Sequence, residues 1–337
     1  MYHTRWKINH YEAGYHYGKR LREHGAKLTD ILPRKEIPGR KEFCEACILV
    51  YQREYPQILA EIRGIADGQE MPFSELSEFL LGMYNYTAQT FCTCFACRQD
   101  DQVIFGRNSD FVTALEDTYD SCYYQLDGCY SFIGNTTSMS QIEDGVNEWG
   151  LAAGLTFVWP VVKAPGLNAG FLVRYILENC RDVPEALLAL ENLTVSSSQT
   201  ITLADRKGNM AVVESNSEKR SVLTPLPGQS FVAAANDFHS SELKACRAPA
   251  EDLIHSGERY QTACGALKEF QGRYSAEFAR DLLAGKYGFM CQYDRTAGMD
   301  TVWSSLYLLN ENKVFRCEGN PSRKKWLEDN RLSFRQQ

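Results

Sequence analysis

The segment 91–110 most constrains what this chain can fold into. It reads Phe-Cys-Thr-Cys-Phe-Ala-Cys-Arg-Gln-Asp-Asp-Gln-Val-Ile-Phe-Gly-Arg-Asn-Ser-Asp. Two runs with strand character flank the polar turn Gln99–Asp101, which predicts a β-hairpin. In a hairpin the end of the second strand returns beside the start of the first, so Arg107 and Asp110 would lie near Cys92. Because cationic neighbours favour the thiolate, this arrangement makes Cys92 a candidate nucleophile.

Bulk properties indicate an ordinary globular protein. The 337 residues, of which 44% are hydrophobic and 23% charged, suffice for one large domain or two small ones. The net charge of −7 argues against a nucleic-acid or anionic-membrane surface. Apolar runs fall short of the roughly 20 residues of a membrane span, and Met1–Lys7 lacks the apolar core of a signal peptide. Twelve cysteines without an export signal favour reduced thiols, so we expect a cytoplasmic protein.

Residues 1–91 are predicted to be mostly helical. Apolar residues recur at helical spacing over 41–68, a stretch that Pro56 should kink or divide and that Gly68 should end. A further helix is expected over 73–86, after Pro72. This region would form a helical cap.

The remainder of the chain alternates between strand pairs and helices. Strand pairs are expected on either side of turn signals such as Asp127-Gly128. Two helices follow, over 170–180 and 183–192, and two more are expected over 256–270 and 275–283. Antiparallel strands in two sheets, with helices inserted between them, predict an α+β layered fold.

Several of these motifs resemble a known enzyme group. Cys-Thr-x-Phe-Ala from Cys92, followed by a short hairpin and Gly-Arg-Asn-x-Asp, resembles the nucleophile segment of the linear-amide group of N-terminal-nucleophile hydrolases. That group includes the choloylglycine hydrolases and the isopenicillin-N acyltransferase-like proteins. The phrase at 61–68, followed by Pro-Phe-Ser-Glu-Leu at 72–76, resembles the leader of the acyltransferase-like branch, and 145–155 resembles its Gly-x-Asn-Glu-x-Gly-Leu hairpin. The resemblance implies a four-layer αββα sandwich of two antiparallel sheets.

The resemblance also implies self-cleavage. In these enzymes the nucleophilic cysteine is the first residue of the mature chain, whereas Cys92 is internal. The implied products are a helical pro-segment, residues 1–91, and a catalytic domain, residues 92–337. A free α-amine with a pKa of about 7.7–8.0 could then accept the thiol proton. A catalytic Cys-His pair has few candidate histidines, because only His239 and His255 follow Cys92.

Further site residues carry over from the same resemblance. Asp110 would contact the free α-amine, and Arg107 would lie by the thiol. Asn236 matches the asparagine that donates to the oxyanion. Thr156 stands where bile salt hydrolases place a second asparagine, and Arg259 matches the arginine of a Ser-x-x-Arg-x-x-x-Ala helix that supports the site.

The implied activity is cleavage or transfer of an acyl group through a thioester on Cys92. The expected substrate is a small linear acyl amide, non-peptide or short-peptide, with an acyl-CoA or an amine acceptor as the alternative partner. We expect no cofactor. Association into a homo-oligomer is compatible with this interpretation. Relatives often have glycine before the nucleophile, so the bulky Phe91 should slow self-cleavage.

A zinc site is the alternative to catalysis. Two Cys-x-x-Cys pairs, Cys44 with Cys47 and Cys94 with Cys97, supply four thiolates, which are the ingredients of a structural zinc site. The chain between the pairs is longer than in usual zinc motifs. This alternative describes a zinc-stabilised binding protein without catalysis.

Overall fold

The hairpin predicted around Cys92 forms, and both of its strands are interior strands of a sheet. The structure, a computed structural model, describes residues 1–32, 37–86, 91–247, 252 and 254–335. Strands β2 (Phe91–Gln99) and β3 (Gln102–Val112) pair antiparallel, with Cys92 opposite Ser109. Asp100 makes the turn with a φ of 51°.

The strands form two sheets, which face each other. The six-stranded sheet has the order β11-β2-β3-β12-β13-β14, and the eight-stranded sheet has the order β1-β4-β5-β6-β7-β8-β9-β10. The remaining bounds in the six-stranded sheet are β11 (Phe231–Ala234), β12 (Met299–Leu308), β13 (Lys313–Cys317) and β14 (Trp326–Glu328). Those in the eight-stranded sheet are β1 (Tyr2–Ile8), β4 (Asp120–Leu126), β5 (Phe132–Thr136), β6 (Asp144–Asn147), β7 (Leu151–Phe157), β8 (Gln199–Asp205), β9 (Met210–Ser215) and β10 (Arg220–Leu223).

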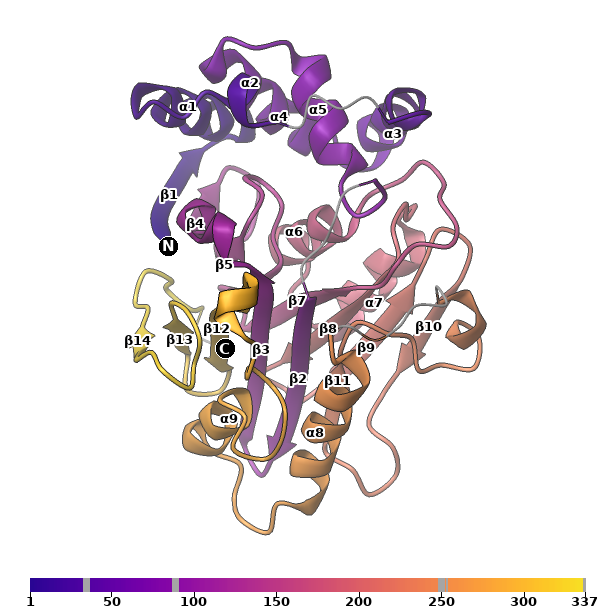
Figure 1. The fold of residues 1–337 in the computed structure, drawn as a ribbon, viewed down its shortest axis with the longest axis vertical. Helices are drawn as coiled ribbons and strands as arrows, with labels where there is room; N and C mark the ends of the chain where they lie inside the picture. Colours follow the sequence, from indigo (N-terminus) through magenta and orange to yellow (C-terminus); the bar gives the residue numbers. More distant parts are fainter. Residues whose placement is uncertain (33–36, 87–90, 248–251, 253, 336–337) are drawn as a thin grey trace.

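Helices cover the outer face of each sheet, which confirms the predicted four-layer α+β sandwich. Helices α8 (Ser256–Glu269) and α9 (Ala276–Leu283) pack on the six-stranded sheet, and α6 (Ala169–Asn179) and α7 (Val183–Asn192) pack on the eight-stranded sheet (Figure 1). Alternation along β2 places Cys94 in the core between the sheets and Cys97 under the outer helices. The two faces of this hairpin therefore look into different environments.

The N-terminal helices gather at one end of the molecule, as Figure 1 shows. They are α1 (His10–Glu23), α2 (Leu28–Ile31), α3 (Arg40–Glu54), α4 (Pro56–Gln69) and α5 (Phe73–Gly82). Pro56 divides the long helical stretch as expected, since it begins α4. Gly68 does not end its helix; α4 continues to Gln69, and Gly68 lies instead where α1 crosses α4.

The first strand was not predicted. Tyr2–Ile8 forms β1, which pairs parallel with β4 at the edge of the eight-stranded sheet, while the other described strand pairs within the two sheets are antiparallel. Only Thr4 and Trp6 of this strand are buried, too short an alternation to stand out in the sequence. The N-terminal region is thus helical apart from a strand that enters the core sheet.

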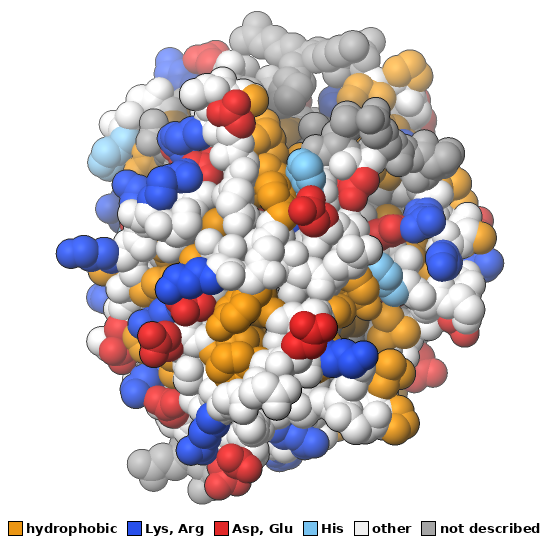
Figure 2. Space-filling view, turned by 60° about the horizontal axis from the view of Figure 1, so that its bottom comes forward, with side chains coloured by type: hydrophobic (Ala, Val, Ile, Leu, Met, Phe, Trp, Pro, Cys, Tyr) orange, Lys and Arg blue, Asp and Glu red, His pale blue; other side chains and the backbone are white. Residues whose placement is uncertain are grey.

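The surface carries charges of both signs. Figure 2 shows acidic and basic side chains interspersed around groups of hydrophobic ones on the face that carries the lower end of the molecule. Within the described ranges, no helix combines the length and the apolar character needed to cross a bilayer.

Candidate active site

The thiol of Cys92 lies against the guanidinium of Arg107. Arg107 Nη2 donates to Cys92 Sγ at 2.8 Å, and both side chains are fully buried between the sheets. The contact follows from the hairpin, because Arg107 is the register partner of Cys94, two residues along from Cys92 on the same face. A fixed cation at this distance stabilises a thiolate.

Two carboxylates from the facing sheet hold Arg107. Its Nη1 donates to Asp144 Oδ1 at 2.9 Å and its Nη2 to Glu143 Oε2 at 3.2 Å. Burial opposes the charged form of Arg107, but the Cys92 sulfur and these carboxylates raise its pKa above the usual value. Gly154 on β7 makes room for the side chain, since a Cβ there would lie 3.2 Å from Arg107 Cδ.

Asp110 lies on the opposite face of the hairpin from Arg107. Its carboxylate accepts from the Thr301 hydroxyl at 2.6 Å and the Tyr293 hydroxyl at 3.2 Å, and it lies 3.8 Å from Arg259 Nη1. Burial raises its pKa to about 6 despite these partners. The register places Asp110 opposite Phe91, at the bond that self-cleavage would break.

Arg259 and Asn236 fix the backbone of Cys92. From α8, Arg259 Nη1 donates to the Cys92 carbonyl oxygen at 2.6 Å, and its Nη2 donates to Asn236 Oδ1 at 2.8 Å. The same Oδ1 accepts from the backbone N–H of Cys92 at 3.0 Å. The backbone on both sides of the Cys92 α-carbon is therefore held by side chains from other elements.

Thr156 forms hydrogen bonds beside Asn236. Its hydroxyl donates to the Ala235 carbonyl oxygen and lies 2.8 Å from the Thr200 hydroxyl. Asn236 Nδ2 in turn donates to the Phe157 carbonyl oxygen at 2.8 Å. These two bonds join the end of β7 to the segment that follows β11, which contains Asn236.

The structure thus gathers the six predicted residues into one region. Cys92 contacts Arg107, Asn236 and Arg259 directly, and Asp110 joins through Arg259. Thr156 joins through the Ala235 carbonyl oxygen, next to Asn236. Four supporting residues were missed: Glu143, Asp144, Tyr293 and Thr301. Their signal was weak, because each is an ordinary polar residue far from Cys92 in sequence.

The four-cysteine zinc alternative is wrong. Cys94 and Cys97 lie on opposite faces of β2, and Cys44 in α3 donates to the Glu78 carbonyl oxygen. A metal site needs three or more His, Cys, Asp or Glu side chains whose ligand atoms lie close together. Among the described residues, the group whose ligand atoms all lie within 4.8 Å of one another contains none of these four cysteines. The pairs belong to separate cores and cannot share one ion.

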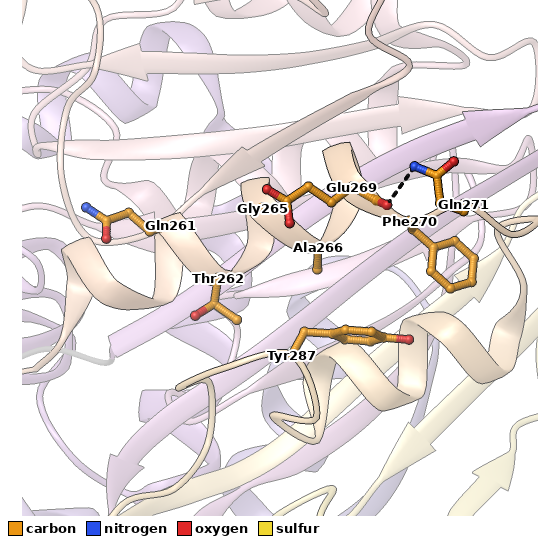
Figure 3. A pocket seen from close by; sticks show the side chains of 8 residues that line it. All are labelled: Gln261, Thr262, Gly265, Ala266, Glu269, Phe270, Gln271 and Tyr287. Carbon is orange, nitrogen blue, oxygen red and sulfur yellow. Dashed lines mark hydrogen bonds between the residues drawn. The ribbon is translucent and has the colours of Figure 1, made fainter.

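A surface groove lies near the site but on the other side of α8. It measures about 290 Å³, and Thr262, Ala266 and Tyr287 face it (Figure 3). Arg259 and Ala263 of the same helix are buried toward the hairpin. The groove and the Cys92 site therefore use different faces of one helix.

Comparison with known proteins identifies the family. The family profile described as "Acyl-coenzyme A:6-aminopenicillanic acid acyl-transferase" matches residues 97–323, more than half of the chain. The match begins just after Cys92. The sequence matches no curated protein.

Solved structures share the fold. A variant of the conjugated bile acid hydrolase from Clostridium perfringens superposes with a TM-score of 0.53 at 14% identity, covering 70% of this chain and 92% of that one. Another variant of the same hydrolase gives 0.51 at 15% identity, with 72% and 98% covered. Penicillin V acylase from Agrobacterium tumefaciens gives 0.50 at 16% identity, with 72% and 87% covered. The chain has the N-terminal-nucleophile hydrolase fold and belongs to the acyl-coenzyme A:6-aminopenicillanic acid acyltransferase family.

Proposed function

We propose that this chain is a self-processing cysteine amidohydrolase or acyltransferase, with Cys92 as its nucleophile. The observation that carries the proposal is the 2.8 Å contact between Arg107 Nη2 and Cys92 Sγ, in a hairpin whose register sets Asp110 opposite Phe91. Family membership supports the reaction class.

Self-processing would begin with attack of Cys92 Sγ on the Phe91 carbonyl carbon. The C–N bond breaks, the acyl group moves to sulfur, and the nitrogen becomes the α-amine of Cys92. Water then hydrolyses the thioester, which leaves a carboxylate on Phe91 and a free thiol on Cys92. Arg259 and Asn236 hold the Cys92 backbone during this step through the bonds described above.

The mature enzyme would use the same thiol on a substrate amide. The α-amine accepts the thiol proton, and Arg107 stabilises the thiolate. Attack on the amide carbonyl gives a tetrahedral intermediate, and the proton passes to the leaving amine as the C–N bond breaks. Asn236 Nδ2 is the candidate oxyanion donor, which requires it to turn from the Phe157 carbonyl. Water or an amine then resolves the thioester.

The first experiment is intact-mass analysis with N-terminal sequencing of freshly purified protein, beside Cys92→Ala. We expect fragments 1–91 and 92–337 from the wild type and a single chain from the variant. A wild-type chain that stays intact, or a variant that is cut at the same bond, contradicts self-processing by Cys92.

The second experiment separates hydrolysis from transfer. The panel is drawn from what the relatives' names state: conjugated bile acids, penicillin V, and an acyl-CoA offered with 6-aminopenicillanic acid. We expect acyl release or transfer by the cut wild type, abolished in Cys92→Ala. Product formed only when the amine acceptor is present assigns a transferase; product formed in its absence assigns a hydrolase.

A further inference from the structure

A mixed cluster of metal-ligand side chains lies outside the catalytic site. His10 is the first residue of α1, Cys129 follows β4, and Glu178 lies in the last turn of α6. Their ligand atoms all lie within 4.8 Å of one another, and among the described residues this is the group of three or more that meets this distance. His10 Nε2 lies 3.2 and 3.1 Å from the two carboxylate oxygens of Glu178.

Backbone hydrogen bonds fix the three segments that supply these side chains. The Tyr130 N–H donates to the Glu178 carbonyl oxygen at 2.9 Å, which holds the Cys129 loop against α6. The Asp127 N–H donates to the Ile8 carbonyl oxygen at 2.6 Å, which holds the same loop beside the start of α1. The cluster is therefore anchored by the main chain and not by its side chains alone.

The donor set suits zinc. Imidazole nitrogen, thiolate sulfur and carboxylate oxygen are its protein ligands, at about 2.0–2.3 Å from the ion. Ligand atoms around a tetrahedral ion at those bond lengths lie roughly 3.3–3.6 Å apart. The distances from His10 Nε2 to the two oxygens of Glu178, 3.2 and 3.1 Å, are close to that separation. Cys129 is partly exposed, whereas His10 and Glu178 are buried, which gives an entry side.

Buried polar groups surround the Glu178 carboxylate. Arg174 forms ion pairs with both Glu61 and Glu178, and the His10 ring also contacts the Glu178 carboxylate. Arg174 Nε and the Tyr55 hydroxyl each donate a hydrogen bond to Glu178.

We propose that His10, Cys129 and Glu178 form a zinc site that joins the N-terminal segment to the rest of the chain. His10 comes from the sequence before Cys92, and the other two ligands come from the sequence after it. Zinc binds cysteine as the thiolate, so binding displaces the Cys129 proton. Water completes the fourth position.

The test uses Co²⁺ as a spectroscopic probe on metal-stripped Cys92→Ala protein, which removes the reactive thiol. We expect a thiolate-to-Co²⁺ charge-transfer band that saturates at one equivalent and disappears on adding Zn²⁺. Cys129→Ser in this background should weaken Co²⁺ binding by about 100-fold or more and lose the band. Cys246→Ser, which changes another partly buried cysteine, is the matched control. It should keep both the Co²⁺ affinity and the charge-transfer band.

Thermal unfolding provides a second measurement of zinc binding. Zn²⁺ in about 100-fold excess over its Kd should raise Tm by a few degrees in the Cys92→Ala parent and in the control, but not in Cys129→Ser. Two results overturn the proposal: a folded parent that shows neither the band nor the Tm increase, or a band that survives in Cys129→Ser. Neither result bears on cleavage at Cys92.

Discussion

Asp110 is a carboxylic acid buried beside the backbone of the proposed scissile bond. The rise of its pKa from 3.8 to about 6 means that the folded chain binds its proton more tightly than the unfolded chain does. Stability due to this group is therefore greatest at low pH and falls as pH rises from about 4 to about 6, by about 3 kcal/mol in total.

Replacing this acid removes that part of the pH dependence. In uncut Cys92→Ala protein, we expect Asp110→Asn to become more stable relative to its parent as pH rises through the same window. Urea unfolding at several pH values measures this. Asp101→Asn, at an exposed turn, should keep the parent's slope. Equal slopes for Asp110→Asn and its parent would show that Asp110 has no raised pKa.

The sequence can identify site residues that a local hairpin brings together. Cys92, Arg107 and Asp110 were found because a hairpin register converts their spacing into proximity. Asp144 and Tyr293 were not, because their contacts depend on how the two sheets and the outer helices meet. Polar residues at such long-range contacts have no local pattern of their own.

Two strand ends meet behind the nucleophile, where Thr156 joins β7 to the segment after β11. Thr156→Val keeps the shape but removes the bond to the Ala235 carbonyl oxygen, so the unfolding free energy should fall by about 1–2 kcal/mol. If Thr156 positions Asn236, cleavage should also slow by roughly tenfold, equal to about 1.4 kcal/mol on the barrier.

The rate is read from the cut fraction at fixed times during cell-free synthesis. Thr156→Ser retains the hydroxyl and should process at the wild-type rate. Stability loss without any change in cleavage rate would assign Thr156 a purely structural role.

Helices α1 and α4 cross in close contact through glycines on both partners. A Cβ on Gly64 would overlap the Tyr11 carbonyl oxygen, and one on Gly14 would overlap that of Glu61. Gly64→Ala should therefore separate the helices and cost about 1–3 kcal/mol or more.

Gly265→Ala in α8 is the matched control, because its Cβ would meet no atom within 4 Å. The higher helix propensity of alanine should make that variant more stable, by up to about 1 kcal/mol. Urea unfolding of both variants measures the difference. A Gly64→Ala protein as stable as the wild type would refute the close packing.

Sequence patterns predicted most elements but not this helix contact. Periodicity identified α4, whereas Gly68 was interpreted as a helix end because glycine usually marks one. Its actual role depends on a neighbouring backbone that only the tertiary structure supplies. β1 was missed for a related reason, since its partner β4 lies across the helical region.

The N-terminal segment is built into the whole molecule. β1 extends the eight-stranded sheet, and Arg331 near the C-terminus donates to the Thr4 carbonyl oxygen. We expect residues 1–91 to remain bound after cleavage. Residues 1–91 and 92–337 expressed together as separate chains should copurify and separate only in denaturant.

Removing β1 tests the basis of that association. Deleting residues 2–8 from the shorter chain should weaken copurification, because the sheet pairing and the Arg331 contact are lost. Chains that separate in native buffer before any deletion would contradict the expectation. This experiment does not require self-cleavage, since the two chains are made separately.

The position of β1 also has a consequence for the order of events at the ribosome. Thr4 and Arg331 are 327 positions apart, and β1 cannot pair until β4 has been synthesised. β1 can therefore join the sheet once residues 120–126 have been made, whereas its contact with Arg331 must wait for the C-terminal part of the chain. Loop closure over such a distance is slow. Asn236 and Arg259, which hold the Cys92 backbone, are also translated long after Cys92. Folding would then delay maturation of the thiol until these residues have been made, so that translation itself acts as the timer.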